Sequence, residues 1–358
     1  SVSVRRIYGE GLLSKVVLLN DLHFGLKSDS PVFRTYIKSF LENILFPYIQ
    51  KNQIKTIIFL GDFLDKRKYV NIETLRFSRT EFFEPLQKMG VKLHMILGNH
   101  DVVFRNTSEV NSTTELYSHY HNVSVYSEPM DVTINGNTVA FVPWLNDDNM
   151  GRFKEFAKKT KSTLCFGHFE IKGYQVLRGI LSETGIDKSE VAMFHKVYSG
   201  HFHQKHDDGR VFYLGTQYDM TFADVDERKG FHVIDLSNGD LEFIQNPYKI
   251  FHRIIYDDSV SIPVLNYETY KDCYVKFVVR KKNKPKELDK ILDRLYSANL
   301  AELNIIEEVD LFVDPKDMVD QTQDTVSIIS KEIDSMIDVN TDRLKTIINE
   351  LYNESYEL

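Results

Sequence analysis

Asp, His and Asn side chains follow five short apolar runs of this chain, each at the point where the run ends. The runs cover residues 15–20, 55–60, 92–97, 163–167 and 195–200. The polar residues that follow them are Asp21 and His23, Asp62, Asn99 to Asp101, His168, and His201 and His203. Apolar runs of this length are typical of strands covered on both faces. Because the carboxyl ends of parallel strands face one crevice, we expect these polar residues to meet there.

The residue types in this set indicate a metal centre. The candidate ligands offer carboxylate, amide and imidazole groups but no thiolate: Asp21, His23, Asp62, Asn99, His168, His201 and His203. This mixture suits Mn²⁺, Fe²⁺ or Zn²⁺ in an open catalytic site rather than a cysteine-based structural zinc site. The set is too large for one ion. It fits two ions that share a bridging carboxylate, an arrangement used for in-line phosphoryl displacement.

The spacing of the ligands gives two further expectations. Residues two positions apart on an extended chain point the same way, so both members of Asp-x-His and of His-x-His would reach the centre. The glycines that precede Asp62, Asn99, His168 and His201 would allow sharp turns where strand meets loop. His206 lies outside the pattern and is predicted to be a surface residue.

The elements that position these residues alternate between strands and amphipathic helices. Helical stretches at 31–52 and 71–90 separate the first three strands, which predicts parallel strands with right-handed crossovers. The dipeptides Asn135-Gly136 and Asn238-Gly239 then predict two β-hairpins. The expected fold class is α+β, with a mixed sheet or two packed sheets and helices outside.

A separate small unit is predicted after about residue 250. It would contain a strand at 273–280, a helix at 285–298 and a strand at 301–309. A polar segment then leads to a tail with two short amphipathic helices. Their apolar faces are formed by Val326, Ile329, Ile333 and Ile337, and by Leu344, Ile347, Ile348 and Leu351.

Composition limits the classes of protein that the chain can belong to. Its 358 residues suggest two or three domains. The net charge of −8 argues against holding nucleic acid by bulk charge alone, although local basic patches are compatible with it. Two cysteines cannot form a disulfide framework, which favours a reducing, intracellular location. No apolar run is long enough for a transmembrane helix, and the first residues lack the apolar core of a secretory signal.

The five motifs, D-x-H, GDxxD, GNHD, GH and GHxH, resemble those of the calcineurin-like metallophosphoesterases over roughly residues 15–245. Their wording here is NDLHFG, GDFLD, LGNHD and SGHFH, which is most similar to the SbcD nucleases, the bacterial and phage counterparts of the Mre-eleven nuclease. The resemblance implies two packed mixed sheets in a four-layer αββα fold. It implies a nuclease domain at 1–250, a small α/β capping domain at 251–310, and a linker with a two-helix tail at 311–358.

The same resemblance implies a role for each residue. Asp21, His23, Asp62 and His203 would hold one ion, and Asp62, Asn99, His168 and His201 the other. The ions would be two Mn²⁺, with Mg²⁺ as a less active substitute. His100 would meet the scissile phosphate and protonate the leaving oxygen, and Asp101 would set the tautomer of His100. Asp65 stands where some members of the family have a histidine that steers exonuclease action.

The implied activity is a DNA nuclease with 3′-to-5′ exonuclease action on duplexes and endonuclease action on single strands, in recombination and double-strand-break repair. Candidate DNA-binding residues are Lys66, Arg67, Lys68, Arg105 and Lys205. The resemblance also implies a homodimer, formed partly by a helix near 112–120 that a Ser112–Glu115 capping box would start. The tail helices would bind an SMC-like ATPase of the SbcC type in the cytoplasm of a bacterial or phage-infected cell.

Two alternatives remain open. A phosphodiesterase for small nucleotides has the GNHD motif but usually lacks a long C-terminal extension. A non-enzymatic scaffold of the same fold would have lost the ligands, all of which are present here. A protein phosphatase is disfavoured, because Lys66, Arg67 and Lys68 follow the GDxxD motif and GNHD ends in Asp101.

Overall fold

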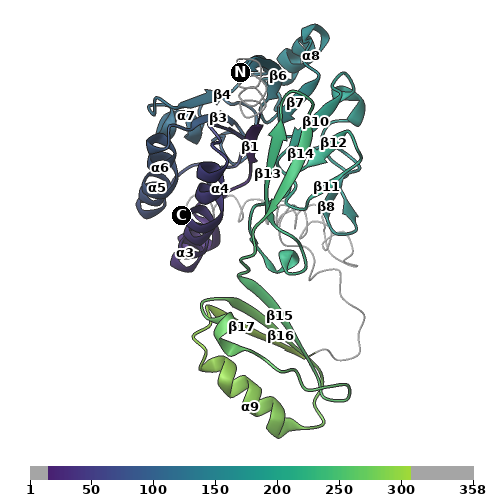
Figure 1. Cartoon of the computed structure of the whole chain (residues 1–358). Coiled ribbons are helices and arrows are strands. Elements are labelled where there is room, and N and C mark those ends of the chain that lie inside the picture. The colour runs from purple at the N-terminus through teal and green to yellow at the C-terminus, as the bar shows by residue number, and fades with distance from the viewer. Residues whose placement is uncertain (1–14, 308–358) are drawn as a thin grey trace, which may run out of the picture. The chain divides into compact units, whose positions relative to one another are not determined.

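Two six-stranded mixed sheets form the larger part of the structure, a computed structural model that describes residues 15–307 (Figure 1). The first sheet has, in spatial order, β14 (Asp240–Gln245), β13 (Gly230–Asp235), β1 (Lys15–Leu19), β2 (Thr56–Phe59), β3 (Lys92–Ile96) and β4 (Val123–Tyr126). The second has β11 (His206–Asp207), β12 (Val211–Tyr213), β10 (Lys196–Ser199), β7 (Leu164–Gly167), β6 (Asn137–Val142) and β5 (Met130–Ile134). The choice between one mixed sheet and two packed sheets is thereby decided.

The predicted strand directions are confirmed. Strands β1 to β4 are parallel, and so are β6, β7, β10 and β12. The two predicted hairpins pair β5 with β6 and β13 with β14, both antiparallel. The ligand-bearing strands therefore belong to different sheets: β1, β2 and β3 to the first, β7 and β10 to the second.

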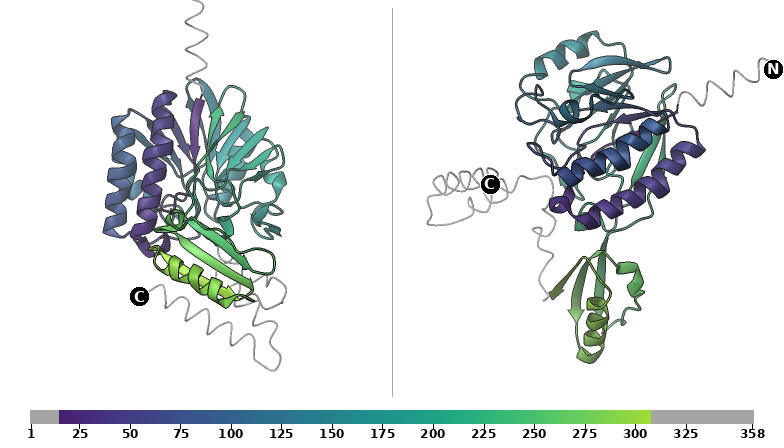
Figure 2. Two further views of the ribbon diagram at one scale, coloured as in Figure 1. Left: turned by 60° about the horizontal axis from the view of Figure 1, so that its bottom comes forward. Right: turned by 90° about the vertical axis from the view of Figure 1, so that its left-hand side faces the viewer.

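Two long helical stretches cover the outer face of the first sheet and lie side by side (Figure 2). Each contains a wider π-helical turn between two α-helices. The stretches consist of α3 (Pro31–Phe40), η1 (Leu41–Leu45) and α4 (Phe46–Lys51), and of α5 (Ile72–Ser78), η2 (Arg79–Phe83) and α6 (Glu84–Lys88). The other helical segments of this region are α2 (Leu26–Asp29), α7 (Ser112–Tyr117), α8 (Met150–Lys159), η3 (Lys188–Val191) and η4 (Phe222–Asp224). Strands β8 (Gln175–Leu177) and β9 (Ile180–Leu181) form a separate small ribbon.

Strand β1 illustrates why its sequence is a continuous apolar run. Val17 and Leu19 pack against the helices, whereas Val16 and Leu18 pack against the second sheet. A strand buried on both faces has no solvent side, so no polar residue alternates with the apolar ones. A third apolar cluster, including Phe153 of α8, lies on the other face of the second sheet.

The start of helix α7 differs from the prediction. The side chain of Asn111 caps it by accepting a hydrogen bond from the Thr114 backbone N–H at 2.8 Å. The capping box predicted from Ser112 to Glu115 is wrong, because Ser112 already lies inside the helix and its hydroxyl donates to the backbone oxygen of Asp101. Asn and Ser cap with similar preference, so sequence alone does not decide between adjacent candidates.

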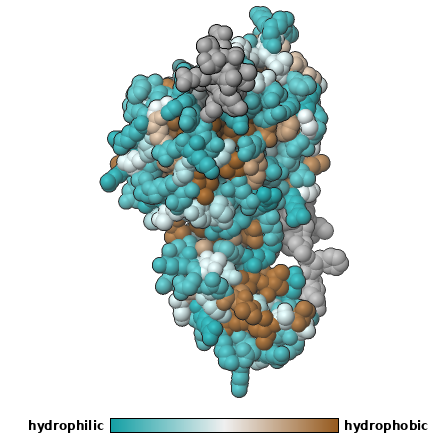
Figure 3. Space-filling view, viewed as in Figure 1, coloured by the Kyte–Doolittle hydropathy of each residue, from teal (hydrophilic) through white to brown (hydrophobic). Residues whose placement is uncertain are grey.

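The predicted small unit contains a three-stranded parallel sheet with its own apolar cluster. Its elements are β15 (Phe251–Asp257), η5 (Tyr267–Tyr270), β16 (Tyr274–Lys281), α9 (Pro285–Tyr296) and β17 (Glu302–Glu307). Hydrophobic side chains also gather on the face of this unit seen in Figure 3. Ile255, Val264 and Ile305 are among its exposed hydrophobic residues. The predicted tail helices lie outside the described residues, and the domain boundaries at residues 250 and 310 remain predictions. Within residues 15–307, no helix combines the length and apolar character needed to cross a bilayer.

Burial of His94 on β3 gives a prediction for pH. The imidazole is 3% exposed and its Nδ1 lies 2.7 Å from the Tyr126 hydroxyl. Burial lowers the pKa of His94 to about 4, below the value near 6.5 that we expect in the unfolded chain. The unfolded state therefore binds the extra proton, so this contribution to stability is complete above pH 6.5 and is lost as the pH falls toward 4.

The expected loss is at most about 1.4 kcal/mol per pH unit in that window. Urea unfolding of the wild type and His94→Gln at pH 7 and pH 5 measures it. The wild type should lose more stability between the two pH values than the variant does. Equal losses in the two proteins would contradict the prediction.

Candidate metal centre

The predicted ligands converge at the carboxyl ends of strands from both sheets. The loops after β1 and β2 are joined by backbone hydrogen bonds, from Asp21 N–H to Gly61 O at 2.8 Å and from His23 N–H to Asp62 O at 3.1 Å. The loop after β10 reaches them through the His201 N–H, which lies 3.0 Å from Asp21 Oδ2. Each sheet therefore supplies part of one centre, as the pattern of strand ends predicted.

The reason for the two-residue spacing is different from the one predicted. Asp21 and His23 do not lie on extended chain, because both have a left-handed backbone, with φ of 46° and 43°. Asp62 has the same conformation, with φ of 60°. Left-handed non-glycine residues cost about 1–3 kcal/mol each and persist only where surrounding structure fixes them. The backbone turns, rather than strand alternation, bring these side chains together.

Close approach of two loops explains two of the glycines. A Cβ on Gly98 would lie 2.2 Å from Asp62 Oδ1, and a Cβ on Gly61 would lie 2.6 Å from the Gly98 Cα. A side chain at position 98 would displace Asp62, and one at position 61 would push against the Gly98 backbone and the His168 ring. Gly61 also has φ of 93°, so the predicted need for a sharp turn is confirmed there.

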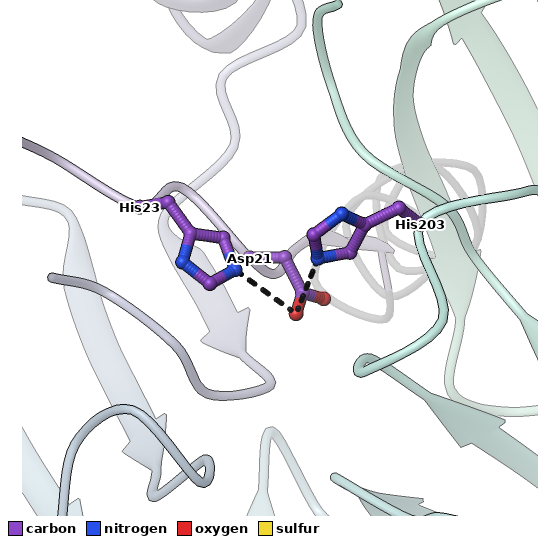
Figure 4. A group of neighbouring side chains, drawn as sticks. All are labelled: Asp21, His23 and His203. Atoms are coloured by element: carbon purple, nitrogen blue, oxygen red, sulfur yellow. Dashed lines mark ion pairs between the residues drawn. The ribbon is translucent and has the colours of Figure 1, made fainter. Parts of the chain in front are cut away.

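The first group of potential ligands consists of Asp21, His23 and His203 (Figure 4). The Nε2 atoms of both histidines lie 3.8 Å from Asp21 Oδ1, and His23 Nε2 lies 3.6 Å from Asp62 Oδ2. These separations are too long for hydrogen bonds but short enough for atoms that share an ion. Both ring nitrogens of His23 are buried and lack a hydrogen-bond partner. A cation would satisfy Nε2, so this group fits a metal ligand set.

The second group consists of Asp62, His168 and His201, with Asn99 between the two histidines. Asn99 Oδ1 lies 3.0 Å from His168 Nε2 and 3.0 Å from His201 Nδ1. His168 Nδ1 donates to the backbone oxygen of Leu60 at 2.6 Å, which in the neutral ring turns the Nε2 lone pair toward Asp62. Metal-binding histidines commonly donate their second N–H in this way. The Asn99 amide could also turn its nitrogen inward and donate to the two imidazole nitrogens. Because a cation binds the amide oxygen rather than the nitrogen, we expect the orientation of Asn99 to depend on cation binding.

Electrostatics in the centre favour neutral imidazoles at two positions. Burial lowers the pKa of His201 to about 3 and that of His203 to about 4, so both rings keep a lone pair at neutral pH. Burial alone would also lower the pKa of His168, but attraction to the Asp62 carboxylate raises it to about 9. Because only a deprotonated imidazole binds a metal, we expect cation binding at His168 to release a proton.

His100 lies beside both groups, but its orienting partner is not the predicted one. Its Nδ1 lies 2.5 Å from the backbone oxygen of Asp65, and its backbone N–H donates to Asp62 Oδ1 at 2.7 Å. The carboxylate of Asp101 instead accepts three backbone N–H groups, from Asp62 at 2.8 Å, Phe63 at 3.0 Å and Gly98 at 2.7 Å. The prediction that Asp101 sets the tautomer of His100 is therefore wrong. Asp101 holds the two loops that carry Asp62 and Asn99.

The five predicted DNA-binding residues occupy different surroundings. Arg67 lies beside a predicted ligand, with one guanidinium nitrogen 3.3 Å from the outer atom of the Asn99 amide. Lys66 lies near Asp29 and over the Tyr69 ring, and Lys205 lies over the Phe243 ring. Lys68 and Arg105 are exposed. The structure thus brings one of the five, Arg67, against a predicted ligand.

His206 is not the surface residue that the sequence predicted. It is half-buried, its Nε2 accepts a hydrogen bond from the Gln175 backbone N–H at 3.1 Å, and its ring stacks on Tyr213. The polar turn after His206 misled the prediction, because that turn closes a hairpin in which His206 pairs with Tyr213, and the β8 contact comes from a residue 31 positions away. His206 supports the second sheet.

The chain belongs to the calcineurin-like phosphoesterase family, to which residues 14–205 match. The family and the two groups of His and Asp ligands define a metal-dependent phosphoesterase, as the motifs predicted. Among curated proteins, exonuclease subunit 1 of Enterobacteria phage T4 is 30% identical to this chain over 352 residues. The alignment covers 95% of this chain and 99% of that protein.

Two solved structures are similar at a lower level. An archaeal phosphodiesterase matches with a TM-score of 0.32 and 11% identity, over 65% of this chain and 99% of its own. A cold-active protein tyrosine phosphatase matches with a TM-score of 0.30 and 13% identity, over 65% of this chain and 80% of its own. Likenesses at this level carry no argument about function.

Lys229 is a residue near the centre that the sequence analysis missed. Its side chain is 3% exposed, its Nζ lies 2.5 Å from Asp224 Oδ1, and it donates to the backbone oxygen of His203 at 2.9 Å. The buried ammonium therefore holds the backbone of a predicted ligand. No local pattern marks Lys229, which lies in the polar segment DERKG.

We expect Lys229→Met to weaken Mn²⁺ binding by about 10–100-fold, because the His203 loop loses its support. The unpaired Asp224 carboxylate should also lower the free energy of unfolding by about 3–5 kcal/mol. Calorimetric titration with Mn²⁺ and urea unfolding measure the two effects. Lys290→Met, which removes an exposed lysine paired with Glu287, is the matched control and should change neither. Wild-type Mn²⁺ affinity in Lys229→Met would contradict this role.

Proposed function

We propose that this protein is a two-metal DNA nuclease subunit that hydrolyses phosphodiester bonds in recombination and double-strand-break repair. Its actions would be 3′-to-5′ exonuclease cleavage of duplexes and endonuclease cleavage of single strands. The observation that carries the proposal is the pair of ligand groups that meet at Asp62, in a chain similar along its length to an exonuclease subunit. Two Mn²⁺ ions are the proposed cofactors, with Mg²⁺ as the less active alternative.

The residue roles follow from the two groups. Asp21, His23 and His203 would hold one ion with Asp62, and Asn99, His168 and His201 would hold the other with the same carboxylate. Bound cations would supply Lewis acidity toward a phosphodiester and activation of water at neutral pH. The burial of Asp62, which is 2% exposed, and its approach to both groups support a bridging position.

His100 would act on the leaving group. Its Nδ1 contacts the Asp65 backbone oxygen, which leaves Nε2 as the ring nitrogen available to the substrate. A general acid must lie within hydrogen-bond reach of the oxygen that it protonates, and His100 lies at the edge of both ligand groups. Arg67 would bind the non-bridging phosphate oxygens, because a guanidinium can donate two parallel hydrogen bonds to a phosphate group.

The wider assembly is also part of the proposal. We propose a four-layer αββα nuclease domain at 1–250, a capping role for the small α/β unit at 251–310, and binding of an SMC-like ATPase by the tail at 311–358. The relative is a subunit by name, which supports the existence of a partner. A homodimer acting on cytoplasmic DNA of a bacterial or phage-infected cell completes the proposal.

Digestion of an end-labelled DNA duplex, compared with hydrolysis of bis-p-nitrophenyl phosphate, tests the proposed substrate. Both should proceed with Mn²⁺ and more slowly with Mg²⁺, and addition of the ATPase partner with ATP should increase DNA degradation. Hydrolysis of the small ester alone would favour the small-nucleotide phosphodiesterase. If neither substrate is hydrolysed with any metal, the non-enzymatic scaffold is favoured.

A further inference from the structure

The only tryptophan of the chain lies against the metal centre. Trp144 follows strand β6, and its ring centroid is 5.1 Å from that of His201 and 6.1 Å from that of His168. Both histidines belong to the second ligand group. The largest aromatic side chain available to a protein is thus placed beside the position at which a phosphodiester would be cleaved.

Trp144 does not pack in a hydrophobic core. It belongs to none of the four apolar clusters of residues 15–307, nor to the apolar side chains packed against them, although its neighbour Leu145 does. The indole is partly exposed. An indole in a core would be stabilised by burial, so its position between the ligand histidines and solvent is not explained by packing of the fold.

The backbone on either side of the indole is fixed. The backbone N–H of Trp144 donates to the Leu97 backbone oxygen at 2.8 Å, and the Trp144 backbone oxygen accepts from Asn149 Nδ2 at 2.9 Å. Asn146 further anchors the loop by donating to the Ser108 hydroxyl at 2.9 Å. Because the backbone is fixed, only the side-chain torsions of Trp144 remain to be ordered when a flat ligand stacks on the ring, which favours binding.

We propose that Trp144 is a stacking platform for a nucleobase of the strand whose phosphate occupies the metal centre. This inference rests on the proposed nuclease function and deepens it. A base inside a duplex has both faces covered by its neighbours, so only a base that has left the stack can use the indole. The preferred substrate is therefore a DNA strand that is unpaired at the scissile position.

Binding of a short oligothymidylate with phosphorothioate linkages, followed by the fluorescence of Trp144 in the presence of Mg²⁺, tests this directly. The matched probe is an abasic strand of the same length and charge. Oligothymidylate should quench the fluorescence and the abasic strand should not, because only the former carries bases. Equal responses to the two strands would overturn the proposal.

Variants separate stacking from support of His201. In Trp144→Leu the affinity for oligothymidylate should fall by about tenfold, the usual size of one base–aromatic contact, and Trp144→Phe should retain most of it. The affinity for the abasic strand should not change in either. Tyr296→Leu, which removes an exposed aromatic ring of α9, is the control. A parallel loss of affinity for both strands and for Mn²⁺, measured by calorimetry, would show that the ring only supports His201 and would overturn the proposal.

Failure of this inference is distinguishable from failure of the nuclease function. A protein that cleaves DNA but binds both strands equally lacks the stacking site and remains a nuclease. A protein that hydrolyses bis-p-nitrophenyl phosphate but neither binds nor cleaves DNA refutes both. If Trp144→Leu does not fold, the wild-type fluorescence comparison and Trp144→Phe still decide the question.

Discussion

Replacement of His100 by alanine should reduce the turnover number by about 10²–10⁴-fold, the usual contribution of a positioned proton-transfer group. The protein should still bind Mn²⁺ at both ligand groups, because His100 is oriented by the backbone oxygen of Asp65 and would protonate the leaving oxygen rather than hold an ion. The fold should also persist, since the His100 backbone N–H that donates to Asp62 is retained.

Turnover of a labelled duplex and calorimetric titration with Mn²⁺ measure the two halves of this expectation. His195→Ala, which removes an exposed histidine directly before β10, is the matched control and should leave both unchanged. Normal cleavage by His100→Ala would remove the proposed role. Loss of Mn²⁺ binding would instead identify His100 as a ligand, an arrangement that its proximity to His23 and Asp62 permits.

Replacement of Asp101 by alanine should lower the free energy of unfolding by at least about 3 kcal/mol. Three buried backbone N–H groups would lose their acceptor at once, and each unsatisfied buried group costs about 1–3 kcal/mol. The same bonds hold the loops that carry Asp62 and Asn99, so Mn²⁺ binding and cleavage should be lost as well. This effect comes from the backbone rather than from any contact of Asp101 with substrate.

Urea unfolding of Asp101→Ala, with Mn²⁺ titration of the folded protein, measures the result. Asp101→Asn retains one acceptor oxygen and should fall between the alanine variant and the wild type. Asp226→Ala removes an exposed aspartate that pairs with Arg253 and should alter stability by less than about 0.5 kcal/mol. Wild-type stability in Asp101→Ala would mean that water or another group satisfies the three N–H groups.

The sequence predicted the location of the centre well because apolar runs and the residues after them are local features. Strands β1, β2, β3, β7 and β10 all end within one or two residues of their predicted bounds. Hydrogen-bond partners were predicted poorly, since they depend on how separate loops meet. The family resemblance implied that Asp101 orients His100, yet its acceptor oxygens face Gly98 and the loop after β2.

Residues without a local motif were missed for the same reason. Lys229 reaches the His203 backbone because the segment after η4 leads back into the first sheet at β13, next to β1. Trp144 reads in the sequence as part of a hairpin, and nothing in its neighbours indicates that it faces two histidines. The left-handed backbone at Asp21 and His23 could likewise not be predicted from the assumption that this segment is extended.

The origin of the ligands in two different sheets has a mechanical consequence. Asp21 and His201 are 180 positions apart in the chain, and each projects from a sheet with separate apolar contacts on its outer face. Cations bound between the two sheets would act as a non-covalent cross-link that closes a very long loop. A cross-link restricts the unfolded chain most when the loop that it closes is long. Removal of the cations by a chelator should then loosen the contact between the two sheets first. Amide hydrogen exchange at the strand ends that carry the ligands would report how much of the molecule's rigidity comes from its ions.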